Sequence, residues 1–333
     1  MMIPKKTLTI IKRVFWVFIP SVLVLGVGIA AINLYLIHRL AHPPVTQLYT
    51  TPRDFQIILE KPMWFDEKWH NSDSTQSVGW FLAHEKAAPT LILSHGYGAN
   101  RSELLTLSFE LWKAGYHVLV YDLRGHGESP VKWSGLGTYE KDDLLSAIKF
   151  VRERKTESGQ SLFDGRVGLY GVDLGGYISL AAAAQDPMVK AVAVDSVYPD
   201  VDHFIKAHLR SSVGSNSLGN RLIESSWRSF LNGLAVQVYL MRDAESVPAV
   251  EAVSANVGRQ FMFITAKDTG LYDETTRELY AMAKGQKQLA EVEHSRMDRL
   301  YEKDATDYDA RVVAFFQQAI PVTTEKSTPA KKK

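Results

Sequence analysis

A short apolar run leading into a turn flanked by glycines constrains this chain more than any other feature. Residues 167–170 are apolar enough for a buried strand, and 177–185 form an alanine-rich stretch typical of a helix. Between them, Gly171 and Gly175 stand two positions before and two positions after Asp173. This spacing predicts a tight strand-to-helix turn that holds its central side chain on a strained backbone, and the central residue of such turns is usually serine.

The rest of the chain alternates compact apolar runs with amphipathic segments. This alternation predicts an α/β fold with a mainly parallel sheet and helices on both of its faces. The interval 196–260 departs from it and is expected to hold one core helix and a small helical lid, with a flexible loop at 211–217. Further strands are predicted at 55–60, 78–83, 90–94, 117–121, 191–194, 261–265 and 288–292, and further helices at 102–114, 139–154, 274–284 and 304–319. Ser102 is the expected N-cap of the first of these helices, and Gly115 its stop.

Composition excludes several functions. Hydrophobic residues make up 46% and charged residues 23% of the chain, which suits a domain with a full core. The net charge of +1 argues against a nucleic-acid partner, because such proteins usually carry a basic face. The absence of cysteine excludes disulfides, thiolate metal sites and a cysteine nucleophile. No His, Asp and Glu cluster has metal-ligand spacing, so neither a metal nor another cofactor is expected.

The N-terminal region carries a membrane signal. Positions 14–37 are 24 residues without a charge, and a helix needs roughly 20 apolar residues to cross the hydrocarbon core. Basic residues are concentrated before this segment, at 5–13, and only Arg39 follows it closely. The positive-inside rule therefore predicts a single-pass signal anchor with a cytoplasmic N-terminus and an extracytoplasmic domain. A cleaved signal peptide is the alternative, but its apolar region would be only about 7–15 residues long.

The remaining segment boundaries are predicted from the positions of prolines and from changes in composition. Residues 1–13 form the cytoplasmic N-terminus, and 38–53 form a linker, because Pro43 and Pro44 cannot continue a helix. A globular domain is predicted at 54–320, with the lid within about 197–260. The polar, lysine-rich tail at 321–333 is expected to be disordered.

Polar or glycine-rich turns follow five of the predicted strands. In an open parallel sheet, ligands bind at the carboxyl ends of the strands. The turns contain His95-Gly96-Tyr97-Gly98, Asp122–Ser129, Asp173, Asp268 and His294, in that order. A nucleophile position, then an acid, then a histidine is the chain order of a Ser-His-Asp type of triad.

Together these motifs resemble the α/β-hydrolase superfamily, in particular its serine-aminopeptidase-like, membrane-anchored branch, over residues 55–319. The resemblance implies that the backbone amides of Tyr97 and Leu174 form an oxyanion hole. It also implies that Asp268 is the triad acid and His294 the base. Asp273 is the second candidate for the acid, because aspartates such as Asp268 also favour turns for structural reasons. His126 and Ser129 are expected to be structural members of their loop.

The aspartate at the elbow leaves the chemistry open between two readings. In the first, Asp173 is a nucleophile, as in haloalkane dehalogenases and epoxide hydrolases, and attacks a substrate carbon to give an alkyl-enzyme ester that a histidine-activated water hydrolyses. In those families a tryptophan that binds the leaving halide follows the nucleophile, whereas this chain has Leu174 at that position. The candidates to bind the leaving group in its place are Trp227, Tyr198 and Tyr239 from the lid region.

In the second reading the domain is a catalytically inactive binding or scaffold module. Attack of a carboxylate on an ester would give an anhydride, so the ordinary serine-esterase mechanism is lost. Aspartate also favours a helix N-terminus, where exposed amides stabilise negative charge, and this explains how the fold tolerates Asp173 under either reading. The partner expected from the first reading is a small-molecule or lipid-like substrate.

Overall fold

The computed structural model describes residues 5–55, 63–213, 217–240, 249–255, 258–297 and 302–322. The chain divides into two compact units. One unit comprises Met1–Leu40 and Leu209–Ala244, and the other comprises Ala41–His208 and Glu245–Lys333. Most of the strand predicted at 55–60 and nearly all of the predicted disordered tail lie outside the described residues.

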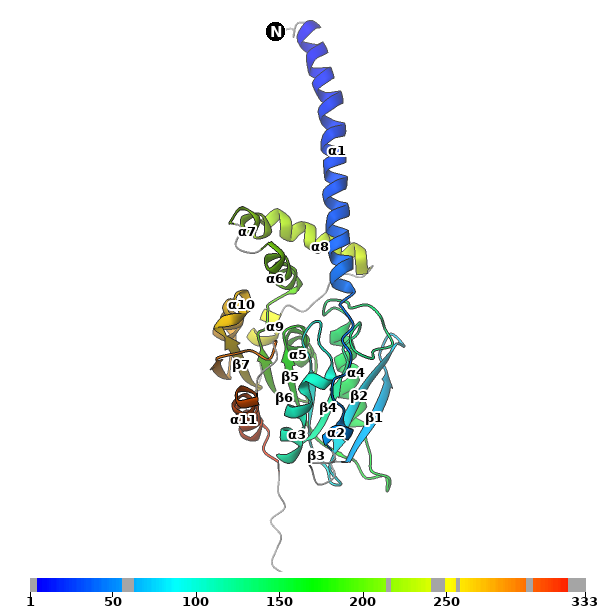
Figure 1. Ribbon diagram of the computed structural model, residues 1–333, viewed down its shortest axis with the longest axis vertical. Helices are drawn as coiled ribbons and strands as arrows, with labels where there is room; N and C mark the ends of the chain where they lie inside the picture. Colours follow the sequence, from blue (N-terminus) through cyan, green and yellow to red (C-terminus); the bar gives the residue numbers. More distant parts are fainter. Residues whose placement is uncertain are drawn as a thin grey trace, which may run out of the picture. The chain divides into compact units, whose positions relative to one another are not determined.

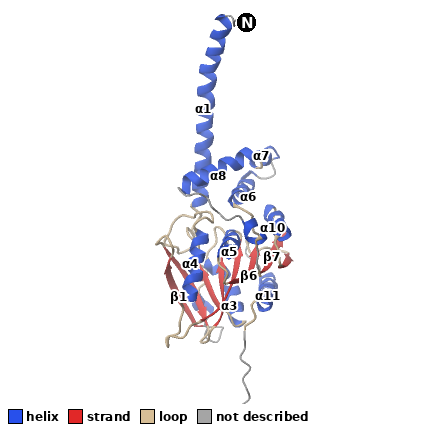
Figure 2. Ribbon diagram, turned by 180° about the vertical axis from the view of Figure 1, so that it is seen from behind, coloured by secondary structure: helices blue, strands red, loops and turns tan. Residues whose placement is uncertain are grey.

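The larger unit is built on a sheet of eight strands in the order β1-β2-β4-β3-β5-β6-β7-β8 (Figures 1 and 2). The pairings of β2 with β1 and with β4 are antiparallel. All pairings from β4 through β3 to β8 are parallel, which confirms the predicted mainly parallel sheet. The strands are β1 (Met63–His70), β2 (Gln76–Ala83), β3 (Ala88–Ser94), β4 (His117–Tyr121), β5 (Phe163–Val172), β6 (Val189–Asp195), β7 (Gln260–Ala266) and β8 (Gln286–Val292).

Helices cover both faces of this sheet (Figure 2). Helices α3 and α11 pack against each other and against strands of the sheet on one face. On the other face, α5 packs against α4, α9 and the central strands, and α10 packs against α9 and β7. The helices of this unit are α2 (Pro52–Phe55), α3 (Leu105–Lys113), α4 (Glu140–Arg152), α5 (Leu174–Gln185), most of α6 (Val201–Val213), α9 (Ala249–Ser254), α10 (Leu271–Met282) and α11 (Glu302–Ala319), with the 3-10 helices η1 (Arg101–Leu104) and η2 (Lys267–Thr269).

The central strands are buried along their whole length. Every residue of β3 and of β4 is buried, as expected for strands covered by helices on both faces. The edge strand β8 buries only Ala290, and its other six residues are exposed or half-buried. The turns at the carboxyl ends of β3, β4 and β5 therefore follow strand ends that are fully buried.

Several element boundaries differ from those predicted. The helix expected from Ser102 begins as η1, and its N-cap is Asn100, whose side chain accepts a hydrogen bond from the amide of Ser102. Gly115 ends α3 as predicted, with a positive φ of 100°. Strand β1 was not predicted, because its sequence mixes charged and aromatic residues at an edge of the sheet.

The smaller unit is helical. It contains most of α1 (Lys5–Ala41), the end of α6, α7 (Ser217–Ile223) and α8 (Ser226–Leu240). Part of α1, Phe15–Ala41, is long and apolar enough to cross a membrane. The flexible loop predicted at 211–217 is wrong at both ends, since α6 continues to Val213 and α7 begins at Ser217. Serine has only a modest penalty inside a helix, so a run of serines does not by itself end one.

Candidate active site

Asp173 lies on the predicted strained turn between β5 and α5. Its φ of 51° and ψ of −115° are unusual for a residue with a side chain. The glycines make this turn possible. A Cβ on Gly171 would lie 2.1 Å from the carbonyl oxygen of Gly175, and a Cβ on Gly175 would lie 2.2 Å from the carbonyl oxygen of Ser94. The backbone of the elbow therefore packs directly on the end of β3.

Asp173 is buried, with 3% of the residue exposed, and one of its carboxyl oxygens accepts a hydrogen bond. Oδ2 accepts a hydrogen bond from the amide of Tyr97 at 3.0 Å. Burial raises the pKa of Asp173 to about 7, although hydrogen bonds from the amides of Tyr97 and Leu174 and from the side chain of Tyr272 oppose this. Oδ1 has no hydrogen-bond partner of normal geometry among the described residues. Its two oxygens are thus in different environments.

His95 fixes the turn that carries the amide of Tyr97. Its Nε2 accepts a hydrogen bond from the amide of Leu123 at 3.0 Å, so the proton must be on Nδ1, which lies 2.8 Å from the carbonyl oxygen of Gly96. Burial lowers the pKa of His95 to about 4. The ring is therefore neutral near pH 7, and it ties the turn after β3 to the turn after β4.

The turn after β4 is organised around the buried carboxylate of Asp122. This carboxylate accepts hydrogen bonds from the amides of Arg101 and Glu128, both at 2.8 Å, and forms an ion pair with the Arg101 guanidinium. Gly127 has a φ of 49°, and a Cβ there would lie 2.5 Å from the Asp122 carboxyl. His126 packs its ring edge against His95 and Tyr97, and its Nδ1 bonds to the carbonyl of Arg124. These contacts give His126 the structural role predicted for it.

Aromatic side chains cover the carboxyl group of Asp173. Tyr97 packs edge-on against Phe204, which in turn contacts Tyr198. The rings of Tyr198 and Tyr272 have centroids 6.0 Å apart. The hydroxyl of Tyr198 is buried and has no hydrogen-bond partner among the described residues. Burial and the nearby charge of Asp173 raise the pKa values of Tyr198 and Tyr272 well above 10, so both phenols keep their protons.

A buried aspartate at the end of β6 was missed by the sequence reasoning. Oδ1 of Asp195 accepts hydrogen bonds from the hydroxyls of Ser196 at 2.8 Å and Ser295 at 2.9 Å. Oδ2 accepts hydrogen bonds from the amide of Arg296 at 2.8 Å and the hydroxyl of Tyr308 at 2.7 Å. Hydrogen bonds to Asp195 therefore hold the segment after β8 against the end of the central strand β6. The polar pair Asp195-Ser196 directly after an apolar strand was the available signal.

The predicted acid and base lie at the ends of β7 and β8. Asp268 belongs to η2, directly after β7, and its side chain lies outside what the structure describes. His294 follows β8 with an exposed side chain, next to the two residues that bind Asp195. Asp273, the second candidate acid, accepts hydrogen bonds from Thr265 Oγ1 at 2.6 Å and Arg277 Nε at 2.8 Å. The hydrogen bonds of Asp173 itself do not include a histidine.

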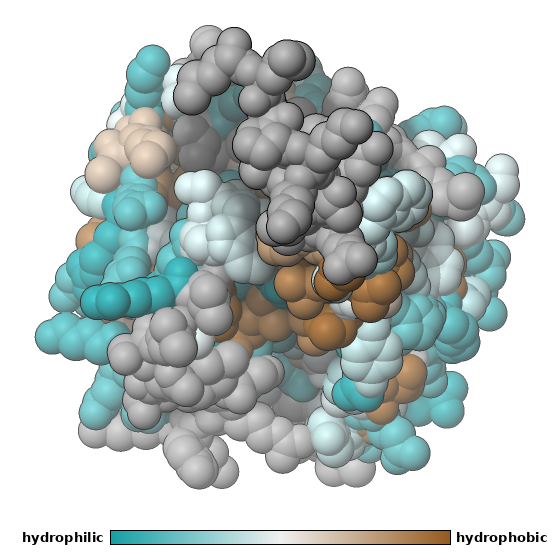
Figure 3. Space-filling model, turned by 90° about the horizontal axis from the view of Figure 1, so that it is seen from above, coloured by the Kyte–Doolittle hydropathy of each residue, from teal (hydrophilic) through white to brown (hydrophobic). Residues whose placement is uncertain are grey.

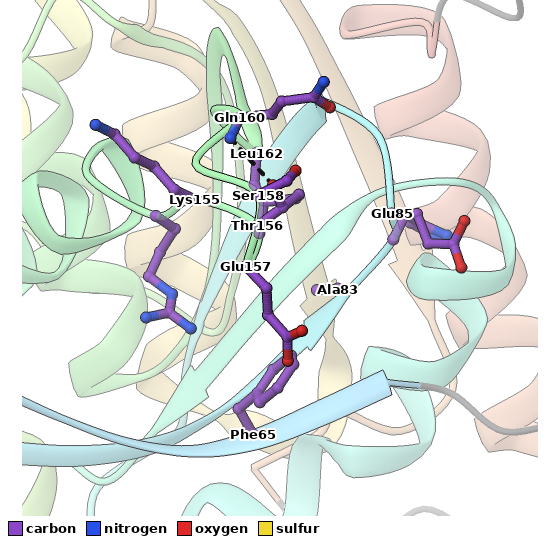
Figure 4. Close-up of a pocket in the computed structure, with 11 residues that line it drawn as sticks. Phe65, Ala83, Glu85, Lys155, Thr156, Glu157, Ser158, Gln160 and Leu162 are labelled. Atoms are coloured by element: carbon purple, nitrogen blue, oxygen red, sulfur yellow. Dashed lines mark hydrogen bonds between the residues drawn. The ribbon is translucent and has the colours of Figure 1, made fainter.

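A surface hollow elsewhere on the domain is not connected with the elbow. Figure 4 shows a surface hollow of about 500 Å³, lined by residues that include Phe65, Lys155, Glu157 and Leu162. Leu162 precedes β5 and Asp173 follows it, so the hollow and the elbow lie at opposite ends of this strand. Within the described ranges, no group of three or more His, Asp or Glu side chains could hold a metal ion.

Comparison with known proteins identifies the family. A model of the alpha/beta hydrolase family matches residues 91–320. The chain belongs to this family. An uncharacterized 31.7 kDa protein from the traX-finO intergenic region of Escherichia coli is 26% identical to this alpha/beta hydrolase over 270 residues, 71% of this chain and 89% of that protein. The uncharacterized protein YfhR of Salmonella typhimurium is 26% identical over 332 residues, 94% of this chain and 97% of its own.

Solved structures of alpha/beta hydrolases show the same fold. An esterase of Pyrococcus furiosus superposes with a TM-score of 0.62 at 18% sequence identity, covering 85% of this chain and 99% of the esterase. At this identity the similarity establishes the architecture. The chemistry of this alpha/beta hydrolase depends on its own residues.

Proposed function

We propose that the protein is a membrane-anchored hydrolase in which Asp173 attacks an electrophilic carbon and forms an alkyl-enzyme ester. The asymmetry of the Asp173 carboxyl carries this proposal. Oδ2 is held by the amide of Tyr97, while Oδ1 has no hydrogen-bond partner of normal geometry among the described residues. A carboxylate nucleophile needs one oxygen that is oriented and another that can form the new bond.

The first step is a displacement at carbon. Oδ1 of ionised Asp173 donates an electron pair to an sp³ carbon, the C–Oδ1 bond forms, and the bond from that carbon to the leaving atom breaks. The leaving atom takes the bonding pair and needs a proton or a hydrogen-bond donor. Tyr198 fits this role, because its hydroxyl is buried, keeps its proton and contacts no acceptor in the described structure. An oxygen leaving group, as in an epoxide, makes the best use of a phenol donor.

The second step is hydrolysis of the ester. Water attacks Cγ of Asp173, the charge develops on Oδ2, and the amides of Tyr97 and Leu174 stabilise it, as in an oxyanion hole. His294 takes the proton from this water and Asp268 orients the imidazolium, in the manner of a triad. The Cγ–Oδ1 bond then breaks, the His294 imidazolium returns the proton to Oδ1, and the product leaves as an alcohol that carries Oδ1. Asp173 is left with Oδ2 and the oxygen of the water, and loses a proton to solvent to restore the carboxylate.

The anchoring part of the proposal rests on α1. Its segment Phe15–Ala41 is long and apolar enough to cross a bilayer, and the basic residues before it favour a cytoplasmic N-terminus. The domain then works outside the cytoplasm beside a membrane, where apolar or lipid-like substrates are concentrated. We also propose that the protein belongs to the membrane-anchored, serine-aminopeptidase-like branch of the family, with Asp173 as the nucleophile in place of serine.

An isotope experiment tests the mechanism. Full-length protein in detergent is given an epoxide panel, a haloalkane panel and p-nitrophenyl esters, and a single turnover is run in ¹⁸O-water. We expect one ¹⁸O atom in the peptide that contains Asp173, because water attacks the enzyme carbonyl. Asp173→Asn should lose turnover. His294→Gln should retain an alkyl adduct detectable by mass spectrometry, while Glu293→Gln, the exposed neighbour, should not.

The binding-module reading has its own outcome. If no panel gives turnover, no adduct forms on Asp173, and Asp173→Ser gains no esterase activity, the hydrolase proposal is wrong and the domain binds without catalysis. Ester hydrolysis gained by Asp173→Ser would show that the amides of Tyr97 and Leu174 can still stabilise an oxyanion.

A further inference from the structure

Helix α8 has the reverse of the usual distribution of apolar side chains. Its buried positions are Asn232, Ala235, Val236 and Leu240, and none of them is aromatic. Four other apolar side chains, including its largest, are exposed: Trp227 48%, Phe230 71%, Leu234 47% and Val238 56%. A helix packed on a water-soluble domain normally directs its large apolar residues inward.

The exposed side chains form one continuous face. Trp227, Phe230, Leu234 and Val238 recur at three- and four-residue spacing, so they lie on one side of the helix. The remaining fully exposed positions of α8 are Ser226, Gly233 and Gln237, so this face has no charge. We call these four apolar residues the α8 stripe. Figure 3 views the molecule from above and shows brown, hydrophobic residues gathered in one area of that view, with teal, hydrophilic residues around them.

Helix α8 is joined to the candidate membrane span within the same compact unit. The hydroxyl of Tyr239 lies 3.0 Å from Nδ1 of His38, and the two rings meet edge-to-face with centroids 5.8 Å apart. His38 is near the C-terminal end of α1, beyond the uncharged segment 14–37. Figures 1 and 2 draw α8 running across α1 instead of along it. A helix that crosses a spanning helix at the end of its apolar segment lies at the depth of the lipid headgroups, along the plane of the bilayer.

We infer that α8 is an interfacial helix that inserts the α8 stripe into the bilayer spanned by α1. The occupant of the stripe is the lipid surface, because the contact between His38 and Tyr239 places α8 at the level where this bilayer ends. Tryptophan and phenylalanine at such a surface bury apolar rings at the boundary between headgroups and acyl chains. This inference rests on the proposed anchoring by α1 and does not depend on the chemistry of Asp173.

The absence of cysteine makes the test direct, since every single-cysteine variant carries one label. Full-length Leu234→Cys, Leu23→Cys and Ser158→Cys are labelled with an environment-sensitive fluorophore. They are reconstituted into phosphatidylcholine–phosphatidylglycerol vesicles that contain lipids brominated at shallow or deep acyl positions. Leu23 reports the span, and Ser158, an exposed residue of the larger unit, is the control. We expect strong quenching of Leu234 by the shallow lipids, quenching of Leu23 by the deep lipids, and none of Ser158.

Each of the other outcomes contradicts one part of the inference. If Leu23 is quenched and Leu234 behaves like Ser158, α1 spans the bilayer and the inference about α8 is wrong. If the Leu234 label is shielded in detergent without lipids and the protein is a dimer there, a second copy covers the stripe and the inference is again wrong. If Leu23 is not quenched, the anchoring proposal fails and the inference fails with it. Phe230→Cys repeats the measurement at a second position of the stripe, in case Leu234→Cys does not fold.

Discussion

The amide of Tyr97 donates a hydrogen bond to Oδ2 of Asp173 at 3.0 Å, across 76 positions of sequence. This bond joins the turn after β3 to the elbow after β5, two neighbouring parallel strands. In a serine hydrolase, the corresponding amide faces the oxygen of a substrate carbonyl. Here the side chain of Asp173 accepts the hydrogen bond of this amide, so in the proposed mechanism the oxyanion hole would hold an oxygen of the enzyme itself.

The rate of adduct formation should depend on the ionisation of Asp173. Burial raises its pKa to about 7, and only the carboxylate can attack. We therefore expect the single-turnover rate to rise about tenfold per pH unit below pH 7 and to level off above it. Mass spectrometry of the adduct between pH 5 and pH 9 measures this. A rate that is flat across this range would rule out Asp173 as the titrating nucleophile.

The stability of the protein should change when the buried carboxyl is removed. The folded pKa of Asp173 lies above the value of 3.8 for an exposed aspartate, so the unfolded state releases the proton first and the free energy of unfolding falls as pH rises from 3.8 to about 7. The Asp173→Asn variant has no carboxyl group to ionise at this position, so its free energy of unfolding does not fall for this reason. We expect the variant to gain stability relative to the wild type by on the order of 4 kcal/mol at pH 8, and little at pH 4. Urea unfolding of both proteins at the two pH values checks this, with Asp304→Asn as the control.

The elbow should not tolerate a side chain on Gly175. A Cβ there would lie 2.2 Å from the carbonyl oxygen of Ser94, which is backbone and cannot move aside. We expect Gly175→Ala to lose more than about 3 kcal/mol of stability. Gly233→Ala is the matched control, because a Cβ at this helical position meets nothing within 4 Å and should stabilise α8 by about 0.5–1 kcal/mol. Equal melting temperatures for the two variants would contradict the geometry.

Asp195 should affect the second chemical step more than the first. It holds Ser295 and the amide of Arg296, which directly follow His294. Asp195→Asn replaces an acceptor by a donor, and a lost buried hydrogen bond to a charged group is worth about 1.5–3 kcal/mol. We therefore expect hydrolysis of the ester to slow roughly 10- to 100-fold while the alkylation rate stays close to that of the wild type. Rapid-quench measurements of both steps separate them, and an equal effect on the two would make Asp195 a purely structural residue.

The sequence was most informative where a local pattern determines the structure. The glycines around Asp173, the histidine-glycine turn after β3 and the glycine-rich turn after β4 each specify a backbone path within a few residues. The sheet class followed from the buried strands for the same reason. Edge strand β1 was missed because half-exposed strands do not form a continuous apolar run.

Long-range polar contacts could not be predicted from local patterns. Asp195 and Ser295 are 100 positions apart, and nothing near either residue indicates the other. The N-cap of η1 was assigned to Ser102 although Asn100 also qualifies, and only the position of the preceding turn decides between them. The orientation of the Asp173 carboxyl likewise depends on a turn from another strand.

The division of the chain also has a consequence for its biosynthesis. The smaller unit combines Met1–Leu40 with Leu209–Ala244, and most of the sheet is encoded between these two segments. A chain that emerges from the ribosome N-terminus first can insert α1 long before α8 exists. Helix α1 is therefore made before strands β1 to β6 but can complete its packing only after them. If α1 is the proposed anchor, a pause or truncation within Leu209–Ala244 would leave it in the membrane with a partly formed sheet and without the rest of the helical unit.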